Sequence, residues 1–109
     1  MAPPNPSLAE LASVLGEDNV RTLVRTYLRD FPKSYAELGR GERRNRHRLV
    51  HNLKSNSRLM GAQVLARRMA EIEARLAADA ASDVTASDLA LIAADFEAAA
   101  TALRTFVGE

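Results

Sequence analysis

The amino-acid sequence predicts an all-α fold: an antiparallel up-down-up-down four-helix bundle with a short additional N-terminal helix. Apolar residues recur three and four positions apart through four long stretches, and no stretch shows the alternation of a half-buried strand. The composition is rich in Ala and Leu and has only 5 glycines in 109 residues, which favours helices. A chain of this length forms one domain with a single core.

A short helix is expected first. Residues 1–6 are rich in proline and should form a flexible N-terminus, so that the bundle domain occupies residues 7–108. Ser7 is the predicted N-cap, and Glu10, three residues later, completes a capping box. Gly16 should end this helix.

The second helix should begin near Glu17 and Asp18, since acidic side chains suit a helix N-terminus. It should end between Gly39 and Gly41. Pro32 lies within it and should kink the helix or reset its hydrogen bonding. The apolar residues at helical spacing in this stretch are Val20, Leu23, Val24, Tyr27, Phe31 and Leu38.

Two further helices are expected in the part of the chain that contains no proline. The third should run from about residue 42 to residue 59, and Gly61 marks its end or a close approach to a neighbour. The fourth should extend over residues 62–80. Its apolar positions are Val64, Leu65, Met69, Ile72 and Leu76.

The last helix should follow a turn at residues 82–87. Thr85 or Ser87 is expected to cap its N-terminus, and Gly108 should end it. The apolar positions that this helix should bury are Leu89, Ile92, Phe96, Leu103 and Phe106.

The candidate functional residues lie in the stretch H-N-L-K-S-N-S-R-L-M-G, residues 51–61. On a helical wheel His51 lies on a polar face, opposite Leu53. Lys54 leans back over the turn that carries His51, and the small Ser55 leaves one side of the imidazole open. An imidazole is partly neutral near pH 7 and can act as a nucleophile. This arrangement suits an incoming phosphoryl group, because phosphoryl transfer needs mainly positioning and charge neutralisation.

This stretch resembles the motif of the histidine-containing phosphotransfer (HPt) domains of bacterial and eukaryotic phosphorelays. The matching residues are His51, Leu53, Lys54, Ser57, Gly61, Ala62 and Leu65. The resemblance covers essentially the whole chain, because the surrounding helices fall where that family has them. One departure is that many members carry Gly after the lysine, whereas this chain has Ser55 followed by Asn56.

The resemblance implies that the phospho-aspartate of a receiver domain donates its phosphoryl group to Nε2 of His51. His51 would then pass the group to another receiver domain, in a response regulator or a hybrid histidine kinase. Lys54 would neutralise the phosphoryl oxygens. The residues expected near the phosphate, giving access, hydrogen bonds or close packing, are Ser55, Asn56, Ser57 and Gly61. Magnesium is expected on the partner receiver, and no cofactor or metal on this chain.

Basic residues surround His51 in the sequence. His47 lies one turn earlier on the same face, but no carboxylate or third ligand accompanies the two histidines there, so no metal site is expected. The residues expected to dock an acidic partner are His47, Arg44, Arg48 and Arg58. The arginines at positions 43, 44, 46 and 48 spread around the helix without interleaved aromatic residues, which argues against a nucleic-acid partner.

Several classes of function are excluded or disfavoured. The chain has no cysteine, and hence no disulfide or thiolate metal site. It lacks a Gly-rich phosphate loop and a catalytic carboxylate pair, so we expect a phosphoryl carrier without an ATP site of its own. It also lacks a membrane span and a signal peptide, so we expect a cytoplasmic location. The initial Met and the complete set of helices favour a stand-alone protein, which we expect to be monomeric.

Two alternative functions stay open. The first is a helical adaptor of the same fold, in which His51 docks partners but is never phosphorylated. The second is a small RNA- or DNA-binding helical domain that uses the arginine cluster, for which strongly salt-dependent binding would be evidence.

Overall fold

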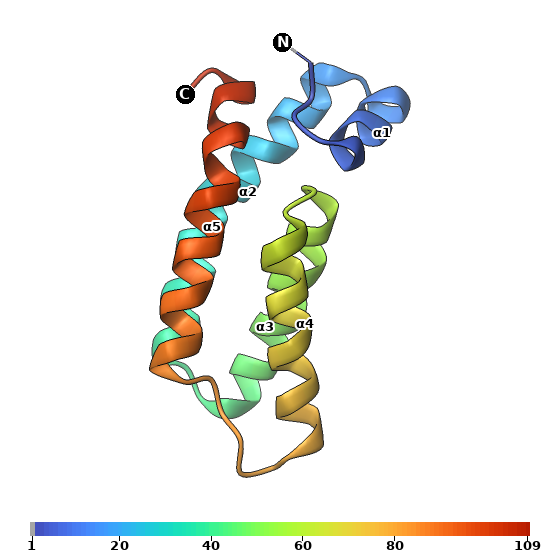
Figure 1. The fold of residues 1–109 in the computed structure, drawn as a ribbon. Coiled ribbons are helices and arrows are strands. Elements are labelled where there is room, and N and C mark those ends of the chain that lie inside the picture. Colours follow the sequence, from blue (N-terminus) through green and yellow to red (C-terminus); the bar gives the residue numbers. More distant parts are fainter. Residues whose placement is uncertain (1) are drawn as a thin grey trace.

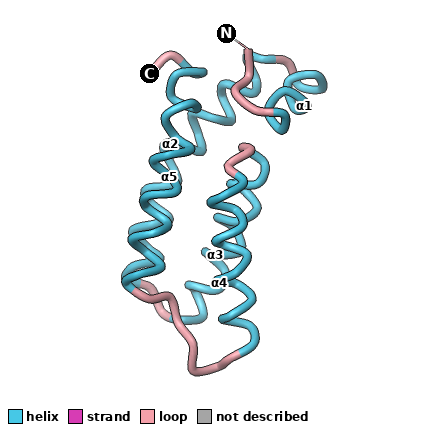
Figure 2. Tube along the Cα trace, in the orientation of Figure 1, coloured by secondary structure: helices cyan, strands magenta, loops and turns pink. Residues whose placement is uncertain are grey.

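The computed structural model describes residues 2–109. Over these residues the chain forms five helices and no strand, which confirms the all-α prediction (Figure 2). The helices are α1 (Pro6–Leu15), α2 (Glu17–Arg40), α3 (Arg43–Leu59), α4 (Gln63–Ala78) and α5 (Ala86–Val107). The segment between α4 and α5, residues 79–85, is the longest connection between consecutive helices.

The helices form an elongated body of 45 × 23 × 18 Å. Helices α2 and α5 run side by side, α3 and α4 form a second pair, and α1 lies at the end where the α3–α4 turn and both termini are found (Figure 1). Helix α3 packs most extensively against α4 and also contacts α2, while α4 contacts α5. Within residues 2–109, no helix is long and apolar enough to cross a membrane.

Helix α1 has a different N-cap from the predicted one. The side chain of Asn5 accepts a hydrogen bond from the Leu8 N–H at 2.9 Å, and Pro6 occupies the first helical position. The predicted capping box of Ser7 and Glu10 was therefore wrong, and the helix begins one residue before the expected domain boundary. The reason is that proline favours the first turn, where its missing N–H would have no intrahelical partner, which places the cap at the residue before it. The flexibility expected of residues 1–6 stays a prediction, and Met1 lies outside the described residues.

Helix α2 continues through Pro32 as one helix of 24 residues. Proline has no N–H, so the carbonyl of Leu28 lacks its usual intrahelical partner. The helix ends where the Gly41 N–H donates to the Glu37 carbonyl at 2.7 Å, as expected from the glycines there. Helix α4 ends at Ala78, two residues before the predicted end.

The predicted cap of the last helix is confirmed at Thr85. Its side chain accepts a hydrogen bond from the Asp88 N–H at 3.0 Å, and the Asp88 carboxylate accepts one from the Thr85 N–H at 2.9 Å. At the other end, Gly108 adopts the left-handed conformation, with φ of 83°, and ends α5 as predicted.

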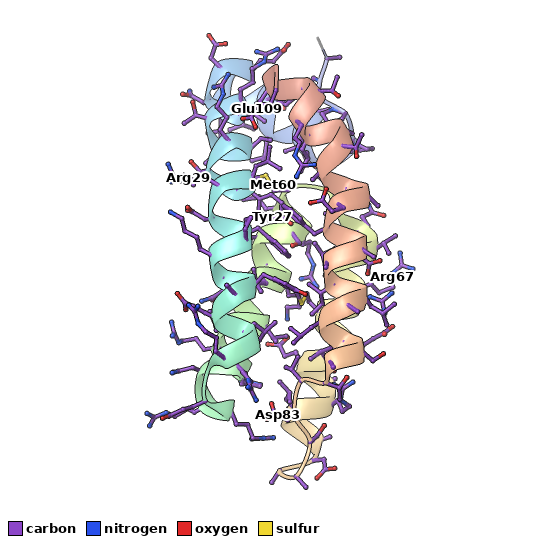
Figure 3. All side chains as sticks on the ribbon, turned by 90° about the vertical axis from the view of Figure 1, so that its left-hand side faces the viewer. Tyr27, Arg29, Met60, Arg67, Asp83 and Glu109 are labelled. Carbon is purple, nitrogen blue, oxygen red and sulfur yellow. The ribbon has the colours of Figure 1, made fainter. Side chains whose placement is uncertain are left out.

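The hydrophobic core lies between the four long helices and is closed at one end by Leu8 of α1. Tyr27 and Met60 point into the interior, whereas Arg29 and Arg67 point to solvent (Figure 3). Most of the predicted core residues are buried. Two of them, Leu23 and Val64, are exposed, so for these two positions the prediction was wrong. Helical spacing defines a stripe, and residues at its border can face either solvent or protein.

Candidate functional site

His51 lies in the middle of α3 with its side chain 56% exposed. The opposite side of the helix, including Leu53, is buried against the core. The expectation of an exposed imidazole therefore agrees with the structure. Because α3 is held by its apolar face, the position of His51 is fixed by the packing of a rigid helix.

The carboxylate of Glu73, on α4, lies against both His51 and Lys54. Its Oε2 is 2.5 Å from Nδ1 of His51, and its Oε1 accepts a hydrogen bond from Nζ of Lys54. The side chains of Lys54 and Glu73 are mostly buried, whereas that of His51 is open to solvent. One carboxylate thus joins the imidazole and the ammonium at the seam between α3 and α4.

The surroundings of Glu73 keep it ionised. The hydrogen bond from Lys54 does most to hold the pKa of the Glu73 carboxyl below its ordinary value. Burial acts in the opposite direction, and the hydrogen bond with His51 lowers the pKa further. At neutral pH Glu73 is therefore a carboxylate, which can only accept hydrogen bonds.

An ionised Glu73 determines which nitrogen of His51 carries the hydrogen. Because the carboxylate accepts, the hydrogen of a neutral imidazole lies on Nδ1, and Nε2 keeps a free lone pair. The same contact holds the ring in one orientation and can stabilise a positive charge that develops on it. The arrangement therefore provides an oriented nitrogen nucleophile at the protein surface.

Glu73 corrects the prediction that no carboxylate accompanies His51. The residue lies next to Ile72 at the edge of the apolar stripe of α4, where single-helix periodicity gives it no special role. The position of the turn between α3 and α4 in the sequence does indicate this contact. His51 lies ten residues before Gly61 and Glu73 twelve residues after it, so an antiparallel hairpin centred on that turn brings the two side chains to the same level.

Two residues next to His51 in the predicted site occupy different surroundings. Ser55 is exposed one turn after His51 on the same face of α3, so its small side chain leaves that side open as predicted. Asn56 is also exposed, but it lies on the α2 side of α3 and borders a hollow between these helices. The structure therefore does not place Asn56 beside the imidazole.

Ser57 lies in the core, in agreement with the close helix packing expected of it, and is not beside the imidazole. Its hydroxyl is fully buried and hydrogen-bonds the hydroxyl of Tyr27 at 2.7 Å. Burial raises the pKa of Tyr27 to about 12, although the bond to Ser57 acts in the opposite direction. Tyr27, predicted only as one of the apolar residues of its helix, therefore remains neutral and satisfies the hydrogen bonding of the buried serine.

Gly61 makes the close approach to a neighbouring segment that the sequence predicts. It has φ of +75°, and a Cβ on it would lie 2.2 Å from the side-chain oxygen of Asn5. The amide of Asn5 donates to the Met60 carbonyl at 3.0 Å beside it. A glycine is therefore required where the N-terminal segment packs on the α3–α4 turn.

The arginine cluster divides into two groups. Arg43 and Arg46 bind backbone carbonyls near the C-terminal ends of α2 and α4. Arg43 donates to Ser82, Leu76 and Asp79 at 2.7, 2.9 and 3.0 Å, and Arg46 to Leu38 at 3.1 Å. Four basic residues on the outer face of α3 form no hydrogen bond or ion pair with the described residues. They are Arg44, His47, Arg48 and Arg58. These four, predicted to dock a partner, are free to do so.

No carboxylate among residues 2–109 forms a hydrogen bond or ion pair with both histidines. Across residues 2–109, no group of three or more His, Asp or Glu side chains could hold a metal ion. Glu73 reaches His51 but has no hydrogen bond or ion pair with His47 among these residues. The exposed His47 thus differs from His51 in lacking a carboxylate partner.

Comparison with known proteins yields no relative. The chain matches no family model, and no significant match is found among curated proteins or solved structures. The resemblance to HPt domains therefore stays a prediction, and the function has to be inferred from the site.

Proposed function

We propose that this chain is a histidine phosphotransfer protein of a two-component phosphorelay. His51 accepts a phosphoryl group from the phospho-aspartate of one receiver domain and passes it to the aspartate of another. The observation that carries the proposal is the contact of Glu73 with Nδ1 of His51, because it leaves Nε2 of an exposed imidazole free to attack.

In the proposed reaction the lone pair of Nε2 attacks the phosphorus atom of the aspartyl phosphate. The new N–P bond forms as the bond between phosphorus and the aspartate oxygen breaks, and the carboxylate leaves with the electron pair. The imidazole gains a positive charge while its hydrogen stays on Nδ1. Glu73, which already accepts that hydrogen, stabilises the charge, so no proton has to leave His51. Transfer to a second receiver is the same reaction reversed.

Lys54 supplies positive charge next to the reacting group. Its ammonium is bound to the same carboxylate as His51, and it can share its hydrogens with the phosphoryl oxygens. We therefore expect Lys54→Ala to slow phosphorylation and Lys54→Arg to do less damage. In this proposal the magnesium ion belongs to the receiver domain, and the chain itself is a carrier without an ATP site.

The proposal includes the bundle topology. The contacts of α2 with α3 and α5, and of α4 with α3 and α5, support a closed antiparallel up-down-up-down bundle. Such a bundle presents the middle of one helix to a partner on a rigid support. We also place the carrier in the cytoplasm as a monomer.

Replacing each histidine in turn tests the site. His51→Gln should abolish uptake of acid-labile phosphate from a phosphorylated receiver domain. His47→Gln is the matched control, since His47 is an exposed histidine of the same face with no carboxylate partner among residues 2–109. It should keep the capacity while changing the rate. Full labelling of His51→Gln would overturn the site assignment and make His47 the next candidate.

The same experiment addresses the alternatives. Wild-type protein that binds receivers but takes no label from any of them would indicate an adaptor. A nucleic-acid function is the weaker alternative, because Arg43 and Arg46 hold backbone carbonyls and are not free to contact phosphates. Salt-sensitive binding to generic RNA or DNA by the wild type, lost in Arg44→Ala, would support that alternative.

A further inference from the structure

Two histidines lie one turn apart on the outer face of α3, and only one of them reacts in the proposed function. His47 and His51 are both exposed, and they are the only histidines of the chain. His51 has a carboxylate partner and a free Nε2, whereas His47 has no task beyond contact with a partner protein. The two side chains together, here called the histidine pair, offer a chemistry that phosphoryl transfer leaves unused.

The histidine pair has the spacing of a metal-binding motif. Side chains four residues apart on a helix are neighbours, with Cβ atoms about 5–6 Å apart. Two histidines at this spacing bind zinc in the helical H-E-x-x-H motif, with Zn–N distances of about 2.0–2.1 Å. His47 and His51 have the same spacing within the continuous helix α3. One metal ion can therefore bridge their imidazoles.

Glu73 prepares His51 for a metal ion as well as for a phosphoryl group. Its Oε2 lies 2.5 Å from Nδ1 of His51, and a hydrogen on Nδ1 leaves the lone pair of Nε2 to a ligand. Histidines that bind metals commonly donate their other ring N–H to a carboxylate, which fixes the ring and makes the ligating nitrogen more basic. His51 is therefore an oriented ligand, and His47 is the second ligand within reach.

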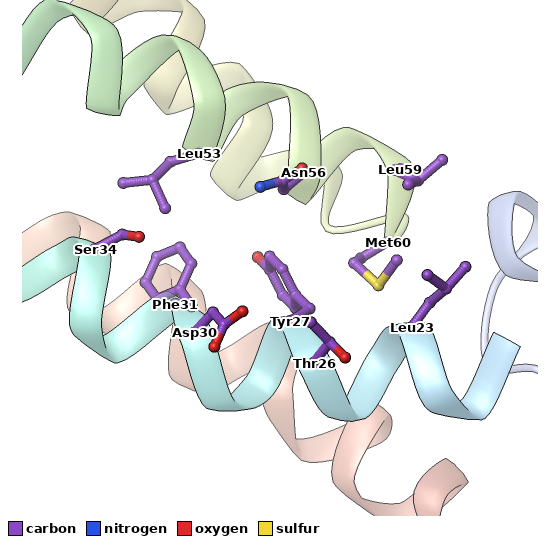
Figure 4. A pocket seen from close by; sticks show the side chains of 10 residues that line it. All are labelled: Leu23, Thr26, Tyr27, Asp30, Phe31, Ser34, Leu53, Asn56, Leu59 and Met60. Carbon is purple, nitrogen blue, oxygen red and sulfur yellow. The ribbon is translucent and has the colours of Figure 1, made fainter. Parts of the chain in front are cut away.

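The remaining coordination positions of a bridging ion are open to water. Leu53 and Asn56 point from α3 toward the hollow beside α2 (Figure 4). The histidine pair lies on a different face of this helix, and the His51 side chain is 56% exposed. Since residues 2–109 contain no group of three or more His, Asp or Glu side chains that could hold a metal, water completes the coordination. Two protein ligands and water hold an ion that exchanges with the solution, unlike the three or four ligands of a resident metal.

Charge and ligand type decide which ion the histidine pair can hold. Arg44 and Arg48 lie on the same face of α3 without an ion-pair partner among the described residues, and they repel any cation. An ion attracted by charge alone would therefore not stay, whereas one that forms coordinate bonds with imidazole can. Mg²⁺ and Ca²⁺ prefer oxygen ligands, but Zn²⁺, Cu²⁺ and Ni²⁺ bind imidazole well. The pair therefore selects a divalent transition-metal ion, and the magnesium of a receiver domain does not compete for it.

We infer that His47 and His51 together bind a divalent transition-metal ion such as Zn²⁺, and that this ion reversibly blocks phosphorylation of His51. The lone pair of Nε2 can bind either the metal or the phosphorus atom, so the two exclude each other. By linkage, phosphorylation of His51 releases the ion. The block rests on the proposed phosphotransfer function. The inference also narrows the expectation from the sequence: a resident metal is still not expected, whereas an exchangeable ion is.

Calorimetric titration of the protein with Zn²⁺ alone tests the histidine pair without any phosphorylation. His47→Gln and His51→Gln should each weaken Zn²⁺ binding about tenfold or more, because binding to the second ligand of a pair is intramolecular. The matched control combines His47→Gln with Asn45→His, which keeps two exposed histidines but places them on different faces of α3. This control should bind Zn²⁺ as weakly as His47→Gln alone. An affinity equal to that of the wild type would overturn the metal site.

Labelling by phosphoramidate, a small phosphoryl donor that needs no receiver domain, tests the block. Each rate is divided by the rate of the same variant without Zn²⁺, because His47→Gln changes the basal rate itself. At a Zn²⁺ concentration about ten times the dissociation constant of the wild type, labelling of the wild type should slow about tenfold. Labelling of His47→Gln should slow about twofold or less, and removal of the ion with EDTA should restore the wild-type rate.

The outcomes separate the block from the phosphotransfer function. A wild type that binds Zn²⁺ at the histidine pair and is labelled at an unchanged rate would overturn the block and leave the function standing. If phosphoramidate and phosphorylated receivers label no form of the protein, the function and the block fail together, while the titration still decides the metal site. Mg²⁺ at the same concentration should not slow labelling, and slowing equal to that by Zn²⁺ would overturn coordination by imidazole.

Glu73→Gln tests the support of the ligand. The neutral amide makes Nε2 of His51 less basic than the carboxylate does, so Zn²⁺ binding should weaken about tenfold. Glu71→Gln, an exposed glutamate on the same helix, is the matched control and should bind as the wild type does. Equal Zn²⁺ affinities of these two variants would overturn the part assigned to Glu73 in the metal site.

Discussion

The α2–α5 pair and the α3–α4 pair use different interactions. Between α2 and α5 the contacts are aromatic: Phe31 and Phe96 stack with ring centroids 4.0 Å apart, and Tyr27 lies 5.9 Å from Phe96. On the outer seam between α3 and α4 the contact is charged, and Glu73 joins His51 to Lys54. One pair of helices therefore buries its aromatic side chains, and the other holds a reactive group at the surface.

Because of this difference, folding stability depends mainly on the first pair of helices and the reactivity of His51 on the second. Buried aromatic rings stabilise the fold through the apolar area that they remove from water. This contribution depends little on how the rings are oriented. A charged contact near the surface contributes little free energy, but it depends on direction and can hold an imidazole in one tautomer. Substitutions in the aromatic interior should therefore change folding stability, and those in the seam should change chemistry.

The largest effect is expected in the aromatic interior. Phe96→Ala removes one ring of the stack and should lower the free energy of unfolding by about 3–5 kcal/mol. Denaturant unfolding measures this change. Leu91→Ala, on the exposed side of the same helix, is the control and should stay within about 0.5 kcal/mol of the wild type. Comparable losses in the two variants would mean that the faces of α5 are misassigned.

A smaller effect is expected at the turn that joins the two helices of the charged seam. Gly61→Ala places a Cβ at a residue with φ of +75° and within 2.2 Å of the Asn5 side chain. We expect a loss of about 1–3 kcal/mol, the range for strained backbone, as the side chain that caps α1 is displaced.

Gly39→Ala is the matched control for this turn. Gly39 lies within α2, where the nearest atom to an added Cβ is 3.9 Å away, and alanine favours helix by about 1 kcal/mol. The two substitutions should therefore have opposite signs in a thermal unfolding experiment. A stabilising Gly61→Ala would show that Asn5 does not hold the turn.

The next effect on stability is expected from the partly buried group of the arginine cluster. Arg43→Ala leaves three backbone carbonyls without their charged donor and should cost about 1–3 kcal/mol. Arg44→Ala, one residue later and exposed, should change the free energy of unfolding by less than about 0.5 kcal/mol. Equal melting temperatures of the two variants would contradict the division of the cluster.

The aromatic interior could be predicted from periodicity within single helices, whereas the charged seam also requires the register that the turn between α3 and α4 sets. Helical spacing within one segment identified Phe31 and Phe96 as core residues, because the period of a helix is a local property. The pairing of His51 with Glu73 depends on the register between two helices, which the turn sets. Periodicity within a single helix contains no information about it.

The other differences between the predicted and the observed site also arise from contacts between distant segments. Arg43 and Arg44 are identical side chains at consecutive positions, and what separates them is that Arg43 faces the end of α4. Ser57 matched a motif of small residues, yet its role is set by Tyr27 on another helix. Gly61 matched the same motif for a reason supplied by Asn5, far away in the sequence. In each case the sequence shows the residue type but not the distant segment that contacts it.

The smallest change in stability is expected from Glu73→Gln. At pH 7 it should cost about 1 kcal/mol, since glutamine can still accept a hydrogen bond from the mostly buried Lys54 and only the charge of the carboxylate is lost. The pKa of Glu73 is lowered in the folded state, so its contribution is present above the ordinary glutamate pKa of about 4.3 and is lost as the pH falls through the folded value. The difference between wild type and Glu73→Gln should therefore shrink as the pH falls below the ordinary glutamate pKa, which a series of unfolding experiments from pH 7 into acid measures.

The same variant should change the chemistry far more than the stability. Glutamine can still accept the hydrogen of Nδ1, but it carries no charge to stabilise the imidazolium that forms as the phosphoryl group arrives. Losing about 1.4 kcal/mol of that stabilisation slows uptake about tenfold, and we expect a slowing of at least this size. Rapid-quench labelling with phosphoramidate measures the rate without a docking partner. Glu71→Gln, on the same helix and exposed, is the control. If Glu73→Gln takes up label as fast as Glu71→Gln, the carboxylate holds the two helices together and has no part in the reaction.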